Sequence, residues 1–162
     1  MTSLTICFLN VRGMNDKLKR RQLFLWLRKK DFSIYFLQET HSENKTENIW
    51  RNEWGFTSYF CHNRAGVPVL FKNNFEFAIK KYFAANNGRF IIIDVEIIDN
   101  VIYTLINVYA FNEDRPELFD LILQHLSDFE SENIIFGGDF NCVRNINLDK
   151  KRGKANKKFQ IL

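Results

Sequence analysis

The sequence predicts an α+β fold in which packed β-sheets carry helices on their outer faces. Helical and strand-like segments are mixed along the chain, and residues 56–109 hold several consecutive β segments. Runs of successive strands favour sheets packed face to face over a regular alternation of strand and helix. With 162 residues, 46% of them hydrophobic, the chain is long enough for one core, and we expect a single domain over residues 1–162.

The first third of the chain predicts two strands and two helices. The strands cover residues 4–9 and 32–37, and the helices cover residues 15–30 and 47–53. Each strand is a short apolar run typical of a buried strand. Asn15 or Asp16 can cap the first helix. We expect Leu23, Trp26 and Leu27 to form the inner face of that helix.

The middle of the chain is mostly β. The strands expected here cover residues 67–71, 91–97 and 101–109, with a turn at residues 86–88. Pro68 lacks a backbone N–H, so its strand should lie at a sheet edge or a bulge. In the second of these strands, apolar residues alternate with Asp94 and Glu96, which predicts a half-buried strand.

The clearest helix runs from Pro116 to Phe129. Proline is suited to the first turn of a helix. One stripe of this helix is apolar and consists of Leu118, Leu121, Ile122, Leu126 and Phe129. His125 lies on the same stripe, so we expect it to pack against the core. A final strand over residues 134–136 leads into residues 137–141, which read GGDFN.

Charge is distributed unevenly along the chain. Residues 16–30 contain seven Lys or Arg and one Asp, and residues 144–158 have the same count, so each segment carries +6. Because the whole chain carries +4, the remaining residues carry −8. Two basic segments around an acidic middle suit a protein that binds a polyanion and presents carboxylates to it. On charge alone, a solvated helix face and a basic tail fit these segments as well.

Several classes of protein are disfavoured by what the sequence contains. Cys7, Cys61 and Cys142 are far apart and form no C-x-x-C pair, which argues against a disulfide framework or zinc knuckle and favours a reducing intracellular compartment. No apolar run approaches the roughly 20 residues of a membrane helix. The first residues do not resemble a secretory signal. Walker and G-x-G-x-x-G loops are absent.

Polar residues follow four of the expected strands at their carboxyl ends. These residues are Asn10, Glu39, Tyr109 with Asn112, and Asp139 with Asn141. Each alone also fits a cap, a turn, a surface charge or a packed ring, whereas the four ends together favour one shared site. Carboxylates and amides suit a hard cation such as Mg²⁺. Such a cation can neutralise a phosphodiester while a second carboxylate orients or deprotonates water.

Five short strings, in this order, carry a family resemblance. They are NVRG at residues 10–13, LQETH at 37–41, GVPVL at 66–70, NVYAFN at 107–112 and GDFN at 138–141. Together they resemble the endonuclease/exonuclease/phosphatase superfamily, the group of DNase I and the apurinic repair endonucleases. Within it, the chain is most similar to the endonuclease domain of non-LTR (long interspersed element) retrotransposon polyproteins. Order and spacing match from residue 4 to about residue 152.

The resemblance implies a four-layer α/β/β/α sandwich and a metal site. Glu39 would be the main Mg²⁺ ligand, with Asn10 beside it and Mn²⁺ as an alternative cofactor. The candidates for contacting nucleic acid are Arg12, Arg64, Lys150, Lys151 and Arg152.

The resemblance also implies catalytic roles for four residues. Asp139 would align or activate the attacking water, and Asn141 would hold the scissile phosphate. Tyr109 would donate a hydrogen bond to a phosphate oxygen, and Asn112 would support that site.

The function implied is that of a magnesium-dependent DNA endonuclease. Its nick would give a 3′-hydroxyl that primes reverse transcription, so the implied partners are DNA and a covalently linked reverse transcriptase domain, with no membrane and with residence in the nucleus. The alternatives are an inactive nucleic-acid-binding remnant and a phosphatase of the same superfamily acting on inositol phosphates or sphingolipids.

Two departures from the family pattern matter. Pro68 stands where the pattern usually has a small residue. Family members also continue to a Ser-Asp-His string whose His and Asp act at the scissile phosphate, and nothing after Asn141 supplies it here. We therefore expect residues 1–162 to be the amino-terminal portion of the domain, incomplete at the carboxyl terminus and inactive by themselves.

Overall fold

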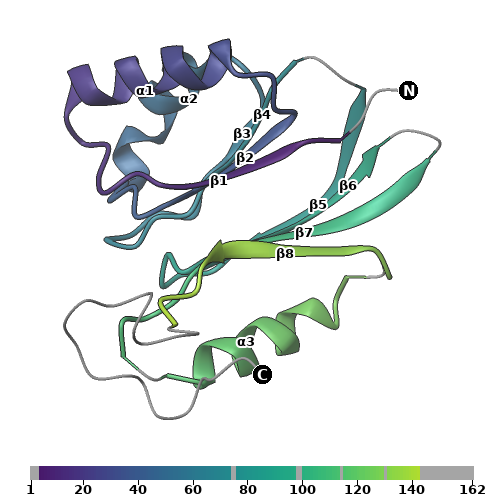
Figure 1. The fold of residues 1–162 in the computed structure, drawn as a ribbon. Helices are drawn as coiled ribbons and strands as arrows, with labels where there is room; N and C mark the ends of the chain where they lie inside the picture. The colour runs from purple at the N-terminus through teal and green to yellow at the C-terminus, as the bar shows by residue number, and fades with distance from the viewer. Residues whose placement is uncertain (1–3, 74–75, 98–99, 114, 130, 143–162) are drawn as a thin grey trace, which may run out of the picture.

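Two four-stranded sheets pack face to face between helices (Figure 1). The structure is a computed structural model that describes residues 4–73, 76–97, 100–113, 115–129 and 131–142. Helices α1 and α2 cover the outer face of one sheet, and α3 covers the outer face of the other. This is the four-layer α/β/β/α arrangement predicted from the sequence.

The first sheet has the strand order β1-β2-β4-β3. Its strands are β1 (Ile6–Asn10), β2 (Ile34–Gln38), β3 (Ser58–Tyr59) and β4 (Val69–Phe71). Strands β1 and β2 are parallel, with Asn10 opposite Gln38. The carboxyl ends of these two strands therefore lie side by side.

The second sheet has the order β5-β6-β7-β8. Its strands are β5 (Phe77–Ala84), β6 (Phe90–Ile97), β7 (Val101–Tyr109) and β8 (Ile134–Asp139). Strands β7 and β8 are parallel, with Tyr109 opposite Asp139. This pairing brings a second pair of carboxyl ends together.

Three helices complete the layers: α1 (Lys17–Lys29), α2 (Glu47–Trp54), which follows a 3-10 turn at Asn44–Thr46, and α3 (Glu117–Leu126). The side chain of Asp16 accepts a hydrogen bond from the Lys19 N–H and caps α1, as the sequence predicts. None of the helices in the described ranges has the length and apolarity needed to cross a membrane.

A buried polar bridge joins the two sheets. The side-chain amide of Gln38, at the end of β2, donates to Asn107 Oδ1 in β7 at 2.8 Å. Asn107 Nδ2 in turn donates to the carbonyls of Leu37 and Pro68, both at 2.9 Å. Asn107 is fully buried, and its three bonds fix the position of β7 against the first sheet immediately below the strand ends.

Three expectations about the elements were wrong. In α1, Leu27 is buried and Leu23 packs against the core as predicted, but Trp26 is 45% exposed and Phe24 is the other buried apolar residue of the inner face. Pro68 directly precedes β4, which is an interior strand rather than an edge. Strand β6 is buried along nearly its whole length, because it is an interior strand and the hydroxyl of Thr104 donates to Asp94, which allows that carboxylate to be buried.

The prediction that His125 packs against the core is confirmed. Its ring stacks on that of Phe83, with the ring centroids 3.8 Å apart.

Candidate active site

The candidate site lies where the carboxyl ends of strands from both sheets meet. Asn10 ends β1 and Asp139 ends β8, and Asn10 Nδ2 donates to Asp139 Oδ2 at 2.8 Å. Gly137 makes this approach possible, because a Cβ at that position would overlap the ring of Phe8 in β1. Two residues 129 positions apart in sequence are thus in direct contact.

Asp139 is held from several sides. Its Oδ1 accepts a hydrogen bond from the Asn141 N–H at 3.1 Å, while Oδ2 is bonded to Asn10. Its carbonyl accepts from the Ala110 N–H at 2.8 Å, and Asn141 Nδ2 donates to the Ala110 carbonyl at 2.7 Å. The ends of β7 and β8 are therefore joined by backbone and side chain, which fixes the direction of the Asp139 carboxylate.

Tyr109 ends β7 directly opposite Asp139 in β8. Burial raises the pKa of its hydroxyl above the ordinary range, and the charges of Glu39 and Asp139 raise it further. A hydrogen bond with Asn141 and the charge of Arg89 act in the opposite direction. Because the pKa of this hydroxyl is raised, the phenol remains protonated at neutral pH and can donate a hydrogen bond.

Backbone strain is concentrated around the site. Four non-glycine residues adopt left-handed φ angles here: Arg12 at 48°, Glu39 at 59°, His41 at 57° and Asn141 at 49°. Such conformations cost of order 1–3 kcal/mol each and often occur at functional sites. At Glu39, the carbonyl accepts a hydrogen bond from the Gly13 N–H at 2.6 Å, which holds the strained loop in place.

The residues at the strand ends fit a hard divalent cation. Within the described residues, no Lys or Arg is paired with Glu39, and His41 Nε2 lies 3.7 Å from its carboxylate. No group of three or more His, Cys, Asp or Glu with metal-binding geometry occurs in the described ranges. Carboxylate and amide oxygens suit Mg²⁺, which often takes only one or two carboxylates from the protein and completes its shell with water and substrate. Asn10 Oδ1 already accepts from the Arg12 N–H, so one lone pair remains for a cation.

Three of the four predicted catalytic residues line one open pocket of about 660 Å³, whereas Tyr109 and Glu39 are not among its lining residues. Asn10, Asn112, Asp139 and Asn141 contribute to its wall. Asn112 lies at its exposed rim. Sequence reasoning thus identified residues that the fold brings together.

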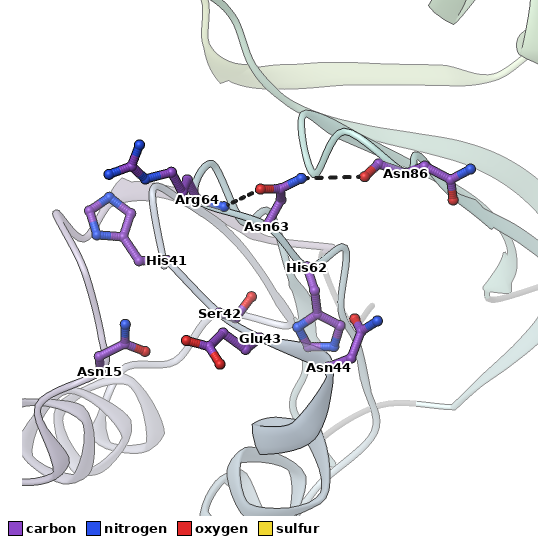
Figure 2. A pocket seen from close by; sticks show the side chains of 9 residues that line it. All are labelled: Asn15, His41, Ser42, Glu43, Asn44, His62, Asn63, Arg64 and Asn86. Atoms are coloured by element: carbon purple, nitrogen blue, oxygen red, sulfur yellow. Dashed lines mark hydrogen bonds between the residues drawn. The ribbon is translucent and has the colours of Figure 1, made fainter.

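Two of the candidates for contacting nucleic acid, Arg12 and Arg64, lie within the described residues. Arg12 is exposed in the loop after β1, and Arg64 lines a second pocket together with His41 (Figure 2). Because His41 is in contact with Glu39, this second pocket adjoins the candidate site. Lys150, Lys151 and Arg152 lie outside the described residues.

Three residues that shape the site were missed. Gln38 and Asn107 stand inside two of the strings that carry the resemblance, and a polar residue within an apolar strand was the available signal. Arg89, which follows the turn at Gly88, had no signal in the sequence, because its contacts depend on how the strands pair.

Comparison with known proteins agrees with this geometry. Residues 7–148 match the Endonuclease/Exonuclease/phosphatase family. The chain is also 31% identical, over 94% of its length, to the "Transposon TX1 uncharacterized 149 kDa protein" of Xenopus laevis. It spans only 12% of that protein.

Solved structures share the fold at low sequence identity. A Danio rerio TDP2 complexed with a single-strand DNA product has a TM-score of 0.64 at 16% identity, with 88% of this chain and 62% of that chain covered. An AP endonuclease of Archaeoglobus fulgidus has a TM-score of 0.61 at 18% identity, with 88% and 59% covered. A mannosyl-6-phosphatase of Bacteroides thetaiotaomicron has a TM-score of 0.65 at 13% identity, with 86% and 66% covered.

Proposed function

Because the chain belongs to the endonuclease/exonuclease/phosphatase family, we propose that it forms the substrate-binding and metal-binding part of a DNA endonuclease. The observation that supports this proposal is the 2.8 Å hydrogen bond from Asn10 Nδ2 to Asp139 Oδ2, which joins the ends of β1 and β8. Glu39 comes directly after Gln38, the residue of β2 that lies opposite Asn10. A carboxylate for a cation, a second carboxylate for water and a protonated phenol for a phosphate oxygen are the groups that phosphodiester hydrolysis requires.

Glu39 would hold a divalent cation, Mg²⁺ or Mn²⁺, with Asn10 beside it. Family nucleases generally use divalent metals. When bound, such a cation neutralises charge on the scissile phosphate and stabilises the leaving oxygen. The lack of a Lys or Arg partner for Glu39 within the described residues leaves its carboxylate available for this role.

The remaining residues would act on water and phosphate. Asp139 would accept a proton from the attacking water, because hydrogen bonds from Asn10 and Asn141 aim its carboxylate. Tyr109 would donate a hydrogen bond from its hydroxyl to a phosphate oxygen. Asn141, whose side-chain amide is held by the Ala110 carbonyl, would bind the phosphate. Asn112, at the rim of the pocket, would support the phosphate there.

DNA is the preferred substrate because the curated relative belongs to a transposon. The fold alone does not select it, since a sugar phosphatase is as similar in structure as the DNA enzymes. We infer that the nick serves retrotransposition and supplies a primer for a reverse transcriptase on the same polypeptide, in the nucleus.

Nicking of supercoiled plasmid tests the proposal. The full natural protein with Mg²⁺ should convert supercoiled DNA to open circles, and Glu39→Gln should slow this by about 100-fold or more. Inositol phosphates and sphingolipids, offered in parallel, should be hydrolysed much more slowly. Equal nicking by the wild-type and Glu39→Gln proteins would exclude Glu39 from the chemistry and refute the proposal.

A further inference from the structure

Arg89 occupies an unusual position behind the candidate site. It follows the turn that precedes β6, and its guanidinium lies between two aromatic rings. The guanidinium carbon is 5.0 Å from the ring centroid of Tyr109 and 4.1 Å from that of Phe111. Cation–π contacts of this kind are worth roughly 0.5–2 kcal/mol and restrict the orientation of the ring.

The same guanidinium is bonded to the end of β7. Arg89 Nη1 donates to the carbonyl of Tyr109 at 3.3 Å and to that of Ala110 at 3.2 Å. The Arg89 carbonyl also accepts the Tyr109 N–H at 2.8 Å, so the two residues are linked through backbone and side chain. Arg89 therefore fixes both the ring and the backbone of Tyr109.

The Ala110 carbonyl extends this network to the other catalytic candidates. It accepts hydrogen bonds from Arg89 Nη1 and from Asn141 Nδ2. Asn141 in turn contacts Asp139 through its backbone N–H. A single carbonyl thus connects Arg89 to the residue proposed to bind phosphate and, through it, to the residue proposed to activate water.

Arg89 also lacks an acidic partner. Within the described residues no carboxylate lies within ion-pairing distance of this half-buried cation, whereas the nearby Arg115 is paired with Glu113. A partly buried charge without a counter-ion is costly. The cost of burying the Arg89 guanidinium is understandable if the site requires the carbonyls and rings that it contacts to be held in one arrangement.

We infer that Arg89 is a positioning residue of the proposed nuclease site. It acts through Tyr109 and through the Ala110 carbonyl on Asn141, and it does not itself touch the reacting phosphate. This inference rests on the proposed function, because it assigns to Arg89 the task of aiming the groups that act on the phosphodiester.

Steady-state nicking by the full natural protein measures the effect. Arg89→Gln should lower kcat by about 10- to 100-fold, the scale expected when reacting groups are misplaced by about 1 Å. The KM for DNA should change less than about 3-fold, since no DNA contact is removed. Arg89→Lys retains the charge but lacks the planar guanidinium that lies over the rings of Tyr109 and Phe111, so it should restore only part of the rate.

Arg115→Gln is the matched control. Its guanidinium carbon also lies over the ring of Phe111, at 4.8 Å, but contacts neither Tyr109 nor the Ala110 carbonyl. We expect its kcat to equal that of the wild type. A loss of rate as large in Arg115→Gln as in Arg89→Gln would show that removing any local cation has this effect and would overturn the inference.

A double-mutant cycle separates positioning from general destabilisation. In a Tyr109→Phe protein, the further effect of Arg89→Gln should shrink, because part of its action passes through the Tyr109 hydroxyl. Full additivity, or a KM effect in place of the kcat effect, would overturn the inference.

A measurement without DNA keeps the inference distinct from the proposed function. In ¹⁵N NMR spectra, the side-chain NH₂ of Asn141 should exchange its hydrogens with solvent faster in Arg89→Gln than in the wild type. In Arg115→Gln, the exchange rate should equal that of the wild type. If the wild type fails to nick DNA while this difference is present, the proposed function is wrong and the network stands. If exchange at Asn141 is identical in all three proteins, Arg89 does not position it.

Discussion

The polar bridge between the sheets gives a direct prediction for Asn107→Leu. Leucine is close to asparagine in size and suits a fully buried position, so the substitution mainly removes hydrogen bonds. Three are lost: one from Gln38, and one each to the carbonyls of Leu37 and Pro68. We expect the free energy of unfolding to fall even though the substitution adds apolar surface to the core.

The expected decrease in the free energy of unfolding depends on which of the released groups keep another hydrogen-bonding partner. A hydrogen bond contributes about 1 kcal/mol net, so three give about 3 kcal/mol. Gln38 keeps its bond to the Phe36 carbonyl, and the Pro68 carbonyl keeps the Leu37 N–H. Two of the three groups released from Asn107 thus remain bonded, and we expect a loss of about 2 kcal/mol.

Urea unfolding followed by two probes measures this loss. Fluorescence reports mainly on Trp50 and Trp54 beside the first sheet, and circular dichroism reports on both sheets. Because Asn107 couples the sheets, the two midpoints should separate in Asn107→Leu. As a control, Asn133→Ala removes an exposed hydrogen bond and should cost less than about 1 kcal/mol. Coincident transitions with a loss below about 0.5 kcal/mol would refute the role assigned to the bridge.

Three further predictions follow from single contacts. Hydrogen bonding to Arg20 lowers the pKa of Glu53. The stability that this carboxylate contributes is therefore present above its ordinary pKa and is lost as the pH falls through the lowered pKa. Glu53→Gln should flatten the acid side of a plot of unfolding free energy against pH. Arg64→Ala should weaken DNA binding at all sequences and reduce the salt slope by about 1, measured by fluorescence anisotropy. Gly66→Ala, at φ +60° and with a Cβ that would overlap Thr40 Oγ1, should destabilise the protein by more than about 1 kcal/mol in thermal melts, and an unchanged melting temperature would contradict this.

The site could be predicted from sequence because its residues follow a simple rule. Asn10, Glu39, Tyr109 and Asp139 each come at or just after the end of an apolar run, and parallel pairing places such ends together. The contact between Asn10 and Asp139 could not be derived in the same way. This contact depends on how the second sheet packs against the first, and local sequence patterns contain no information about the distance between the two sheets.

The errors arose where tertiary packing decides the environment. Trp26 is as apolar as its neighbours, but the sheet lies against the face of α1 that carries Phe24 and Leu27. Asp94 looked like a solvent-facing residue in an alternating strand, and its burial depends on Thr104, ten residues away in the next strand. In both cases the deciding partner lies on another element.

The positioning residues show why the site is built across two sheets. Gln38 and Asn107 join the two sheets directly beneath the strand ends. Glu39 follows Gln38 by one residue and Tyr109 follows Asn107 by two, so this bridge fixes the distance between Glu39 and Tyr109. Arg89 then holds the end of β7, and Asn141 closes the connection to β8. Asn107 and Arg89 are not among the residues that line the pocket. Substitutions at these two positions should therefore alter the rate of the reaction before they alter the binding of DNA.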